Sequence, residues 1–391
     1  MIAKRISEKL ASGSMIRKMF EEGNRLKAIY GPDAVYDFSI GNPDLEPPVE
    51  VRNAVRTLAM SEETGIHAYM SNSGHQVARD AVASHLSRIS GLPVDSSAVC
   101  MTVGAAGAMN AVLRSVLDPG DEVIVLAPFF MEYLSYIDNH DGKAVVVRTD
   151  DHFQPDLVAV AEAITARTKA IIVNSPNNPS GVIYDEETLH RLDQLLLSQD
   201  HLIHIISDEP YAELAYNGKS VPSSLANLTN VIVCYSWSKS LSLPGERIGY
   251  AAVSPRHADK AELSQAIVFC NRILGSVNAP AFFQRVIETA IDAKVDVANY
   301  EYRMNLLYDI VTNAGFRCQK PDGALYLFPK APEDDVAFAA NCAKHNLLVV
   351  PGSAFLCPGY FRLAFCVSEK TIRGSEKAFR EVGQSYGLIP G

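Results

Sequence analysis

Lys239 is the residue whose type and setting are best suited to nucleophilic chemistry. It ends the segment Ser236-Trp-Ser-Lys239, which follows the apolar run 231–235. An apolar run of this length is typical of a buried strand, so we expect the lysine where a strand ends. Partial burial there favours the neutral, nucleophilic form of the amine near neutral pH. The alternative is a solvated lysine at the start of a helix.

Other apolar runs also end in residues able to bind a ligand. These residues are Gly104, Ala105, Ala106, Phe130, Asn178, Asp208 and Tyr211. In a mostly parallel sheet, ligands bind at the carboxyl ends of the strands. We therefore expect all of these residues to face one crevice together with Lys239.

The chemistry of this set fits an aromatic aldehyde that carries a phosphate. Asp208 would keep a pyridinium nitrogen protonated, because an ion pair in a low dielectric favours the charged forms. Tyr211 and Asn178 would hydrogen-bond a hydroxyl on the ring, and Phe130 would stack on the ring face. Taken singly, Asp208 suits a helix cap and Phe130 suits a core, so their joint occurrence carries the argument.

A phosphate would lie at the helix start predicted after the run 98–103. Free N–H groups and the positive end of the helix dipole suit an anion at such a place. The residues expected to hold the phosphate are Ala105, Ala106, Ser236, Ser238 and Arg247. Two alternatives involve no ligand. The small residues at the helix start would serve only close packing, and Arg247 would lie on the surface.

The elements that must position these residues follow from alternating apolar runs and helical stretches. The apolar runs are 98–103, 122–127, 144–147, 170–174, 202–207, 231–235 and 250–253. Strands that are apolar throughout and separated by helices indicate an α/β fold with a mostly parallel sheet, here of seven strands, covered by helices on both faces.

The end of the chain predicts a smaller α+β unit. The stretch 281–314 contains no Gly or Pro and predicts one long linking helix, followed by strands at 324–328, 347–350 and 360–365. The expected parts are an N-terminal arm with part of the small domain (1–45), a large cofactor-binding domain (46–280), and the linking helix with the small C-terminal domain (281–391).

Composition narrows the possible partners and the location. The formal charge of -10 disfavours nucleic acid and anionic membranes as partners, because both require clustered positive surface. Seven cysteines without a C-x-x-C pair predict free thiols and no metal site. The first twenty residues do not match a signal peptide, and no apolar span approaches the roughly 20 residues of a membrane helix. We therefore expect a cytoplasmic protein.

Several segments resemble the signature segments of class I and II aminotransferases, the pyridoxal-phosphate enzymes of fold type I and of the aspartate aminotransferase kind. The segments are Asn174-Ser-Pro-Asn-Asn178-Pro-Ser-Gly181, Asp208-Glu-Pro-Tyr211, and Ser236-Trp-Ser-Lys239 followed by Gly245-Glu-Arg247-Ile-Gly249. The resemblance extends to 39–44, to Tyr69 before Gly74, and to 117–123, 351–355 and 361–365, and so covers nearly the whole chain.

The resemblance implies the roles derived above and adds others. Lys239 would carry the internal aldimine of pyridoxal 5'-phosphate. Arg362 would bind the substrate α-carboxylate, a task for which a planar two-pronged donor is suited, with Gly41 and Asn178 beside it. Tyr69 would reach the cofactor phosphate of the neighbouring subunit, which implies a homodimer with shared sites.

The resemblance also implies a reaction, namely transamination between an L-amino acid and a 2-oxo acid by a ping-pong mechanism, with 2-oxoglutarate as the expected acceptor. A C–S β-lyase on the same fold is the alternative, because it needs the same Lys239. A non-enzymatic cofactor-binding regulator is disfavoured by the acidic charge. The arginine that holds a distal carboxylate in some dicarboxylate enzymes would fall at Ile273, which argues against aspartate as a substrate. The alternative is that residues of the N-terminal segment substitute for this arginine, so the sequence leaves aspartate open.

Overall fold

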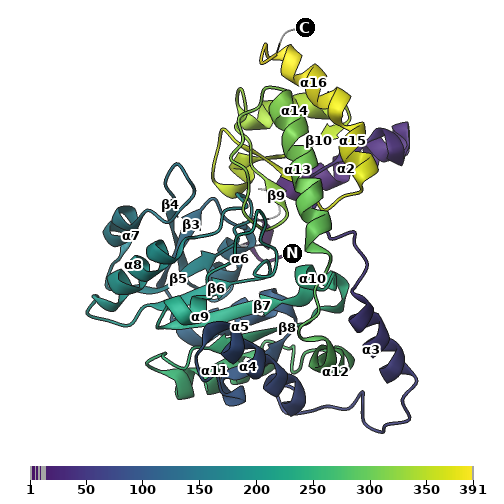
Figure 1. Cartoon of the computed structure of the whole chain (residues 1–391). Coiled ribbons are helices and arrows are strands. Elements are labelled where there is room, and N and C mark those ends of the chain that lie inside the picture. The colour runs from purple at the N-terminus through teal and green to yellow at the C-terminus, as the bar shows by residue number, and fades with distance from the viewer. Residues whose placement is uncertain (1, 5, 8, 10–14, 390–391) are drawn as a thin grey trace.

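A seven-stranded sheet forms the centre of the larger part of the molecule (Figure 1). The structure is a computed structural model that describes residues 2–4, 6, 7, 9 and 15–389. Its strands are β2 (Val99–Thr102), β3 (Glu122–Ala127), β4 (Lys143–Arg148), β5 (Thr168–Asn174), β6 (His204–Asp208), β7 (Val231–Ser236) and β8 (Gly249–Val253). The strand order is β2-β8-β7-β6-β5-β3-β4, and only β8 runs antiparallel to its neighbours. The predicted α/β fold class is confirmed.

Helices cover both faces of this sheet. They are α3 (Val49–Ala59), α4 (Gln76–Ser90), α5 (Gly104–Val116), α6 (Glu132–Asp138), α7 (Leu157–Ala163), α8 (Glu186–Leu197), α9 (Ser224–Asn227), α10 (Trp237–Ser240), α11 (Lys260–Ile273) and α12 (Ala281–Ala290). Along β5, Ile171 and Val173 belong to one core, whereas Ala170 and Ile172 belong to the core on the opposite face. Successive side chains of a strand point to opposite faces, which is why the strands are apolar throughout.

The smaller unit contains a three-stranded antiparallel sheet and four helices. The strands are β9 (Tyr326–Leu327), β11 (Val350–Pro351) and β12 (Phe361–Ala364), and the helices are α13 (Val297–Asn313), α14 (Asp335–Lys344), α15 (Glu369–Gly374) and α16 (Glu376–Ser385). Short 3-10 helices also occur in both parts of the molecule, at Pro32–Ala34, Ser96–Ala98, Pro244–Glu246 and Gly352–Phe355. Phe316, Phe338 and Phe361 pack against one another in the core of this unit, with ring centroids 4.6–5.6 Å apart.

The N-terminal segment joins the smaller unit. Strand β1 (Tyr36–Asp37) pairs in parallel with β10 (Leu347–Leu348), and Phe38 is buried in the same core as Phe379. Figure 1 shows α2 (Met15–Tyr30) beside the C-terminal helices, with α13 running between the two parts of the molecule. The domain bounds 1–45, 46–280 and 281–391 stay a prediction.

The prediction of one long helix over 281–314 is wrong. Helix α12 ends at Ala290 and α13 begins at Val297. The side chain of Asp296 accepts a hydrogen bond from the Asn299 N–H at 3.1 Å, which caps a new helix. The Val295 N–H donates to the Ser240 carbonyl at 2.8 Å and holds the link beside α10. The break therefore comes from a cap and a tertiary contact, because this stretch contains no Gly or Pro.

Candidate active site

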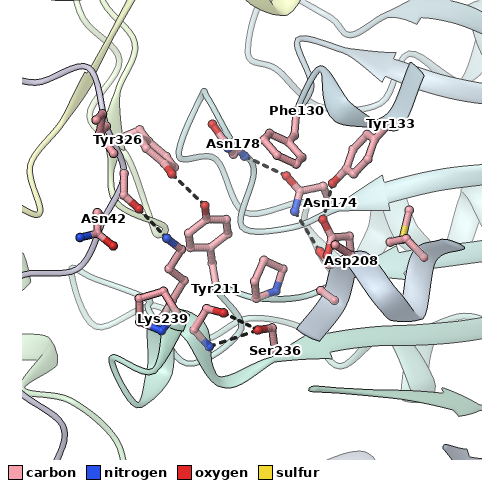
Figure 2. Close-up of a pocket in the computed structure, with 18 of the residues that line it drawn as sticks. Asn42, Phe130, Tyr133, Asn174, Asn178, Asp208, Tyr211, Ser236, Lys239 and Tyr326 are labelled. Atoms are coloured by element: carbon pink, nitrogen blue, oxygen red, sulfur yellow. Dashed lines mark hydrogen bonds between the residues drawn. The ribbon is translucent and has the colours of Figure 1, made fainter. Parts of the chain in front are cut away.

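A cavity of about 430 Å³ lies at the carboxyl ends of the strands, within the size range of small-molecule sites (Figure 2). All the predicted site residues except Gly104 and Tyr69 line it, namely Gly41, Ala105, Ala106, Phe130, Asn178, Asp208, Tyr211, Ser236, Ser238, Lys239, Arg247 and Arg362. Strand ends that are far apart in the sequence thus meet at one edge of the sheet, as the strand-end rule predicts.

Lys239 lies in α10, directly after β7, and is half-buried as expected. Its Nζ donates a hydrogen bond to the Gly41 carbonyl, which brings the N-terminal segment over the strand end. Burial lowers the pKa of the Lys239 amine, and the nearby Arg362 and Arg247 act in the same direction. The structure therefore favours a neutral amine more strongly than solvent does.

Asp208 is the last residue of β6 and is 7% exposed. Its Oδ2 accepts a hydrogen bond from the hydroxyl of Tyr133, whereas its Oδ1 has no partner among the described residues. Burial raises the pKa of Asp208 to about 7, and the hydrogen bond from Tyr133 acts in the opposite direction. A buried carboxylate oxygen without a donor is costly, so this atom suits a cationic N–H of a ligand.

Arg362, in β12, is 3% exposed. Its Nη1 donates to Asn178 Oδ1 at 3.0 Å and its Nη2 donates to the Ser39 carbonyl at 2.7 Å. The guanidinium lies over the rings of Tyr326 and Phe355, 4.5 and 4.8 Å from their centroids. No carboxylate in the described part of the chain pairs with it, and Nε has no hydrogen-bond partner. A buried, oriented guanidinium in this setting suits a ligand carboxylate.

Two tyrosines stand beside Lys239 (Figure 2). The hydroxyls of Tyr211 and Tyr326 are hydrogen-bonded at 2.9 Å, and their rings meet edge to face. Tyr211 follows β6, whereas Tyr326 belongs to β9 in the smaller unit. The cavity is thus closed from both parts of the molecule.

The start of α5 and the loop around Arg247 form a small polar cradle. Gly104 has φ +68°, and a Cβ built on it would lie 2.8 Å from Arg247 Nη2. Ser236 Oγ and Ser238 Oγ are 2.6 Å apart on the other side of the cradle. The backbone N–H groups of a helix start, two hydroxyls and a guanidinium are the donors that a phosphate requires.

Tyr69 lies outside the main cavity and is 91% exposed. It lines a separate pocket together with Asn278, whose amide donates to the Ser71 carbonyl at 2.8 Å. The expectation that Tyr69 reaches the cofactor of a neighbouring subunit stays a prediction.

Three residues that shape the cavity are not among those predicted from the sequence. Asn174 donates from its side chain to the Asp208 carbonyl and accepts from the Asn178 N–H, both at 2.9 Å, so it ties two strand ends together. Tyr133 follows Phe130 by three residues, but the local sequence does not indicate that its hydroxyl reaches Asp208, because this contact depends on how α6 packs against the sheet. Tyr326 carries no local signal either, because its contacts depend on how the smaller unit packs.

Metal-binding clusters and membrane-spanning helices are both absent from the described ranges. No group of three or more His, Cys, Asp or Glu side chains there could hold a metal ion, and no helix there is long and apolar enough to cross a membrane. All seven cysteines are free thiols, as predicted.

Comparison with known proteins gives consistent matches along the chain. The family model for aminotransferase class I and II matches residues 33–375. The aspartate/prephenate aminotransferase of Thermus thermophilus is 33% identical, over 88% of this chain and 89% of that protein. A probable N-acetyl-LL-diaminopimelate aminotransferase of Bacillus subtilis is 31% identical, over 87% of this chain and 86% of that protein. The crystal structure of an amino transferase from Eubacterium rectale has 40% identity and a TM-score of 0.95, and covers 99% of this chain and 100% of that one.

Proposed function

Because the chain belongs to the class I and II aminotransferase family and is a pyridoxal-phosphate-dependent enzyme, we propose that it moves an amino group from an L-amino acid to a 2-oxo acid in the cavity around Lys239. One observation carries the proposal. Lys239 stands in the same cavity as a buried guanidinium, Arg362, and a buried carboxylate, Asp208, and neither of these two has an oppositely charged side chain as partner in the described part of the chain.

The residues of the cavity fit the cofactor. Asp208 Oδ1 would receive the ring nitrogen, Tyr211 and Asn178 the ring oxygen, and Phe130 one face of the ring. The cradle of Ala105, Ala106, Ser236, Ser238 and Arg247 would hold the phosphate. When bound, pyridoxal phosphate supplies an electron sink for the negative charge that develops at the substrate α-carbon. The unpartnered Oδ1 and the close approach of Gly104 to Arg247 support this fit.

The side chains then have distinct tasks. Arg362 binds the α-carboxylate through its two-pronged guanidinium and so fixes the α-carbon near Lys239. The amine of Lys239, whose pKa burial lowers, accepts the α-proton at Nζ and returns it. The ionised carboxylate of Asp208 holds a proton on the ring nitrogen. The rings of Tyr326 and Phe355 lie against the guanidinium and keep it in place.

A half-reaction without acceptor tests the proposal. The loaded enzyme is mixed with one amino acid at a time, and the released 2-oxo acid is measured per site. We expect one equivalent and then a stop, with turnover resuming when a 2-oxo acid is added. Continuous release of pyruvate and ammonia without an acceptor would instead identify the β-lyase, which remains the second candidate.

A panel of amino acids and 2-oxo acids is needed to identify the amino donor and the acceptor. The relatives' names include aspartate, prephenate and N-acetyl-LL-diaminopimelate enzymes, so these amino acids and oxo acids should be compared first. The family resemblance implies 2-oxoglutarate as acceptor, with pyruvate as the natural comparison. A preference for pyruvate of tenfold or more in kcat/KM would overturn the choice of acceptor and leave the reaction type intact.

We also infer a homodimer in the cytoplasm. The exposed ring of Tyr69, which lines a pocket of about 220 Å³ together with Asn278, supports an interface there, and the seven free thiols support a reducing compartment. Mixed dimers of Lys239→Ala and Tyr69→Phe chains test the shared site. Each mixed dimer would contain one intact site, so activity should return on mixing. If the mixture stays at the activity of the two parents, the shared site is refuted. Cell fractionation tests the compartment.

A further inference from the structure

Tyr133 contacts the carboxylate that faces the cofactor site. It lies in α6, is 1% exposed, and donates its hydroxyl to Asp208 Oδ2. The other carboxylate oxygen, Oδ1, receives no hydrogen bond from the residues that the structure describes. Because a carboxylate has two equivalent oxygens, a fixed donor on one of them sets the direction in which the other one points.

The ring of Tyr133 supports a second cofactor contact. Its edge meets the ring of Phe130 at 5.7 Å between centroids and 86° between planes. Tyr133 also stacks with the buried Phe129, with ring centroids 6.2 Å apart and ring planes 15° from parallel. Phe129 therefore holds Tyr133, and Tyr133 limits the rotation of Phe130, as an edge-to-face pair does.

We propose that Tyr133 is a positioning residue for pyridoxal phosphate, whose hydroxyl aims Asp208 at the ring nitrogen and whose ring holds Phe130 against the ring face. The inference rests on the proposed contact between Asp208 and the cofactor. It adds to that proposal by making one side chain, Tyr133, set the positions of two residues proposed to contact the cofactor, Asp208 and Phe130.

The groups around Asp208 make the hydrogen bond from the Tyr133 hydroxyl important for the charge of this carboxylate. The titratable groups that face the carboxylate are Tyr133 and Tyr136 from α6, Glu209 and Tyr211 after β6, and Cys234 from β7. None of these groups is a cation. Burial raises the pKa of Asp208 to about 7, the Tyr133 hydroxyl lowers it, and the buried carboxyl of Glu209 raises it. Removal of the hydroxyl therefore raises the pKa further, and a smaller share of Asp208 is ionised at neutral pH.

The test uses Tyr133→Phe, which keeps the ring and removes only the hydroxyl. Cofactor-free protein is titrated with pyridoxal phosphate from pH 6 to pH 9, and binding is followed by the fluorescence of Trp237, the only tryptophan of the chain. We expect the cofactor Kd to rise about 10- to 100-fold at pH 7, which is the effect of losing one hydrogen bond to a charged group. The pH midpoint of the affinity should also move to higher pH than in the wild type. The cofactor's own titrations are common to both proteins and cancel in this comparison.

Tyr216→Phe is the matched control. Tyr216 is equally buried and donates its hydroxyl to the Ala324 carbonyl at 2.6 Å, away from Asp208. The Tyr216→Phe variant should have a lower Tm than the wild type, with an unchanged cofactor Kd and an unchanged pH midpoint. Tyr133→Leu also removes the support of Phe130, so it should weaken binding beyond Tyr133→Phe.

Two outcomes separate the inference from the proposal on which it rests. If Asp208→Asn weakens cofactor binding but Tyr133→Phe has the Kd and pH midpoint of the wild type, the role of Tyr133 is refuted and that of Asp208 stands. If Asp208→Asn also binds like the wild type, the proposed ring-nitrogen contact itself fails. A pH midpoint that moves equally in Tyr216→Phe would likewise overturn the inference.

Discussion

Replacing Arg362 with leucine should remove recognition of the substrate α-carboxylate while leaving the rest of the site in place. The guanidinium is buried and its orientation is set by Asn178, by the Ser39 carbonyl and by two aromatic rings. A carboxylate bound by two prongs receives two charge-assisted hydrogen bonds, each worth about 1.5–3 kcal/mol. Their loss corresponds to about 3–6 kcal/mol, or roughly 10²- to 10⁴-fold in kcat/KM.

The assay compares the best amino acid of the donor panel with the amine that lacks its carboxylate. For Arg362→Leu, the first-turnover rate with the amino acid should fall by the factor above, and the rate with the amine should change less than threefold. The cofactor Kd should stay near the wild-type value, because Arg362 is not part of the phosphate cradle.

Arg303→Lys is a control for nonspecific damage. Arg303 is also largely buried, but it pairs with Asp44 at 2.5 Å and does not line the cavity. This variant should lower the Tm without changing the ratio of the amino acid rate to the amine rate. An equal loss for amino acid and amine in Arg362→Leu would refute the assignment of Arg362 to the carboxylate.

Two further predictions concern the cofactor site. Because burial raises the pKa of Asp208 to about 7, the unfolded chain releases this proton at lower pH than the folded one, and the cofactor-free fold loses stability as pH rises from about 4 to 7. Asp208→Asn should therefore make the cofactor-free protein about 1–3 kcal/mol more stable than the wild type at pH 8, as measured by urea unfolding. At pH 4 the two proteins should have nearly equal stability. Equal stability at pH 8 would contradict this prediction. Gly104→Ala should weaken cofactor binding at least tenfold, because its Cβ would lie 2.8 Å from Arg247 Nη2 at a φ of +68°; a wild-type Kd in the fluorescence titration would show that the cradle tolerates the side chain.

The strands were predictable because each is buried on both faces and reads as a continuous apolar run. In β5, neighbouring residues such as Ile171 and Ile172 enter different cores, so no polar position interrupts the pattern. The break between α12 and α13 was not predictable in the same way. It depends on the contact from Val295 to Ser240, a residue of another element, and the local sequence contains no helix-breaking residue there.

The same distinction applies to the site. Lys239, Asp208 and Asn178 could be placed because each follows an apolar run, and the carboxyl ends of such runs meet at one sheet edge. Tyr133 and Tyr326 could not, since their hydroxyl contacts with Asp208 and Tyr211 depend on how a helix and the smaller unit pack against the sheet. The local sequence gives little information about residues whose role depends on tertiary contacts.

Chemical trapping of the cofactor tests the central claim most directly. The loaded enzyme is reduced with borohydride, digested, and the modified peptide is identified by mass spectrometry. The label should be found on Lys239, in the peptide that contains Ser236-Trp-Ser-Lys239, and should be absent after prior conversion with an amino donor. A label on any other lysine, or no label at all, would contradict the assignment of Lys239 as the nucleophile.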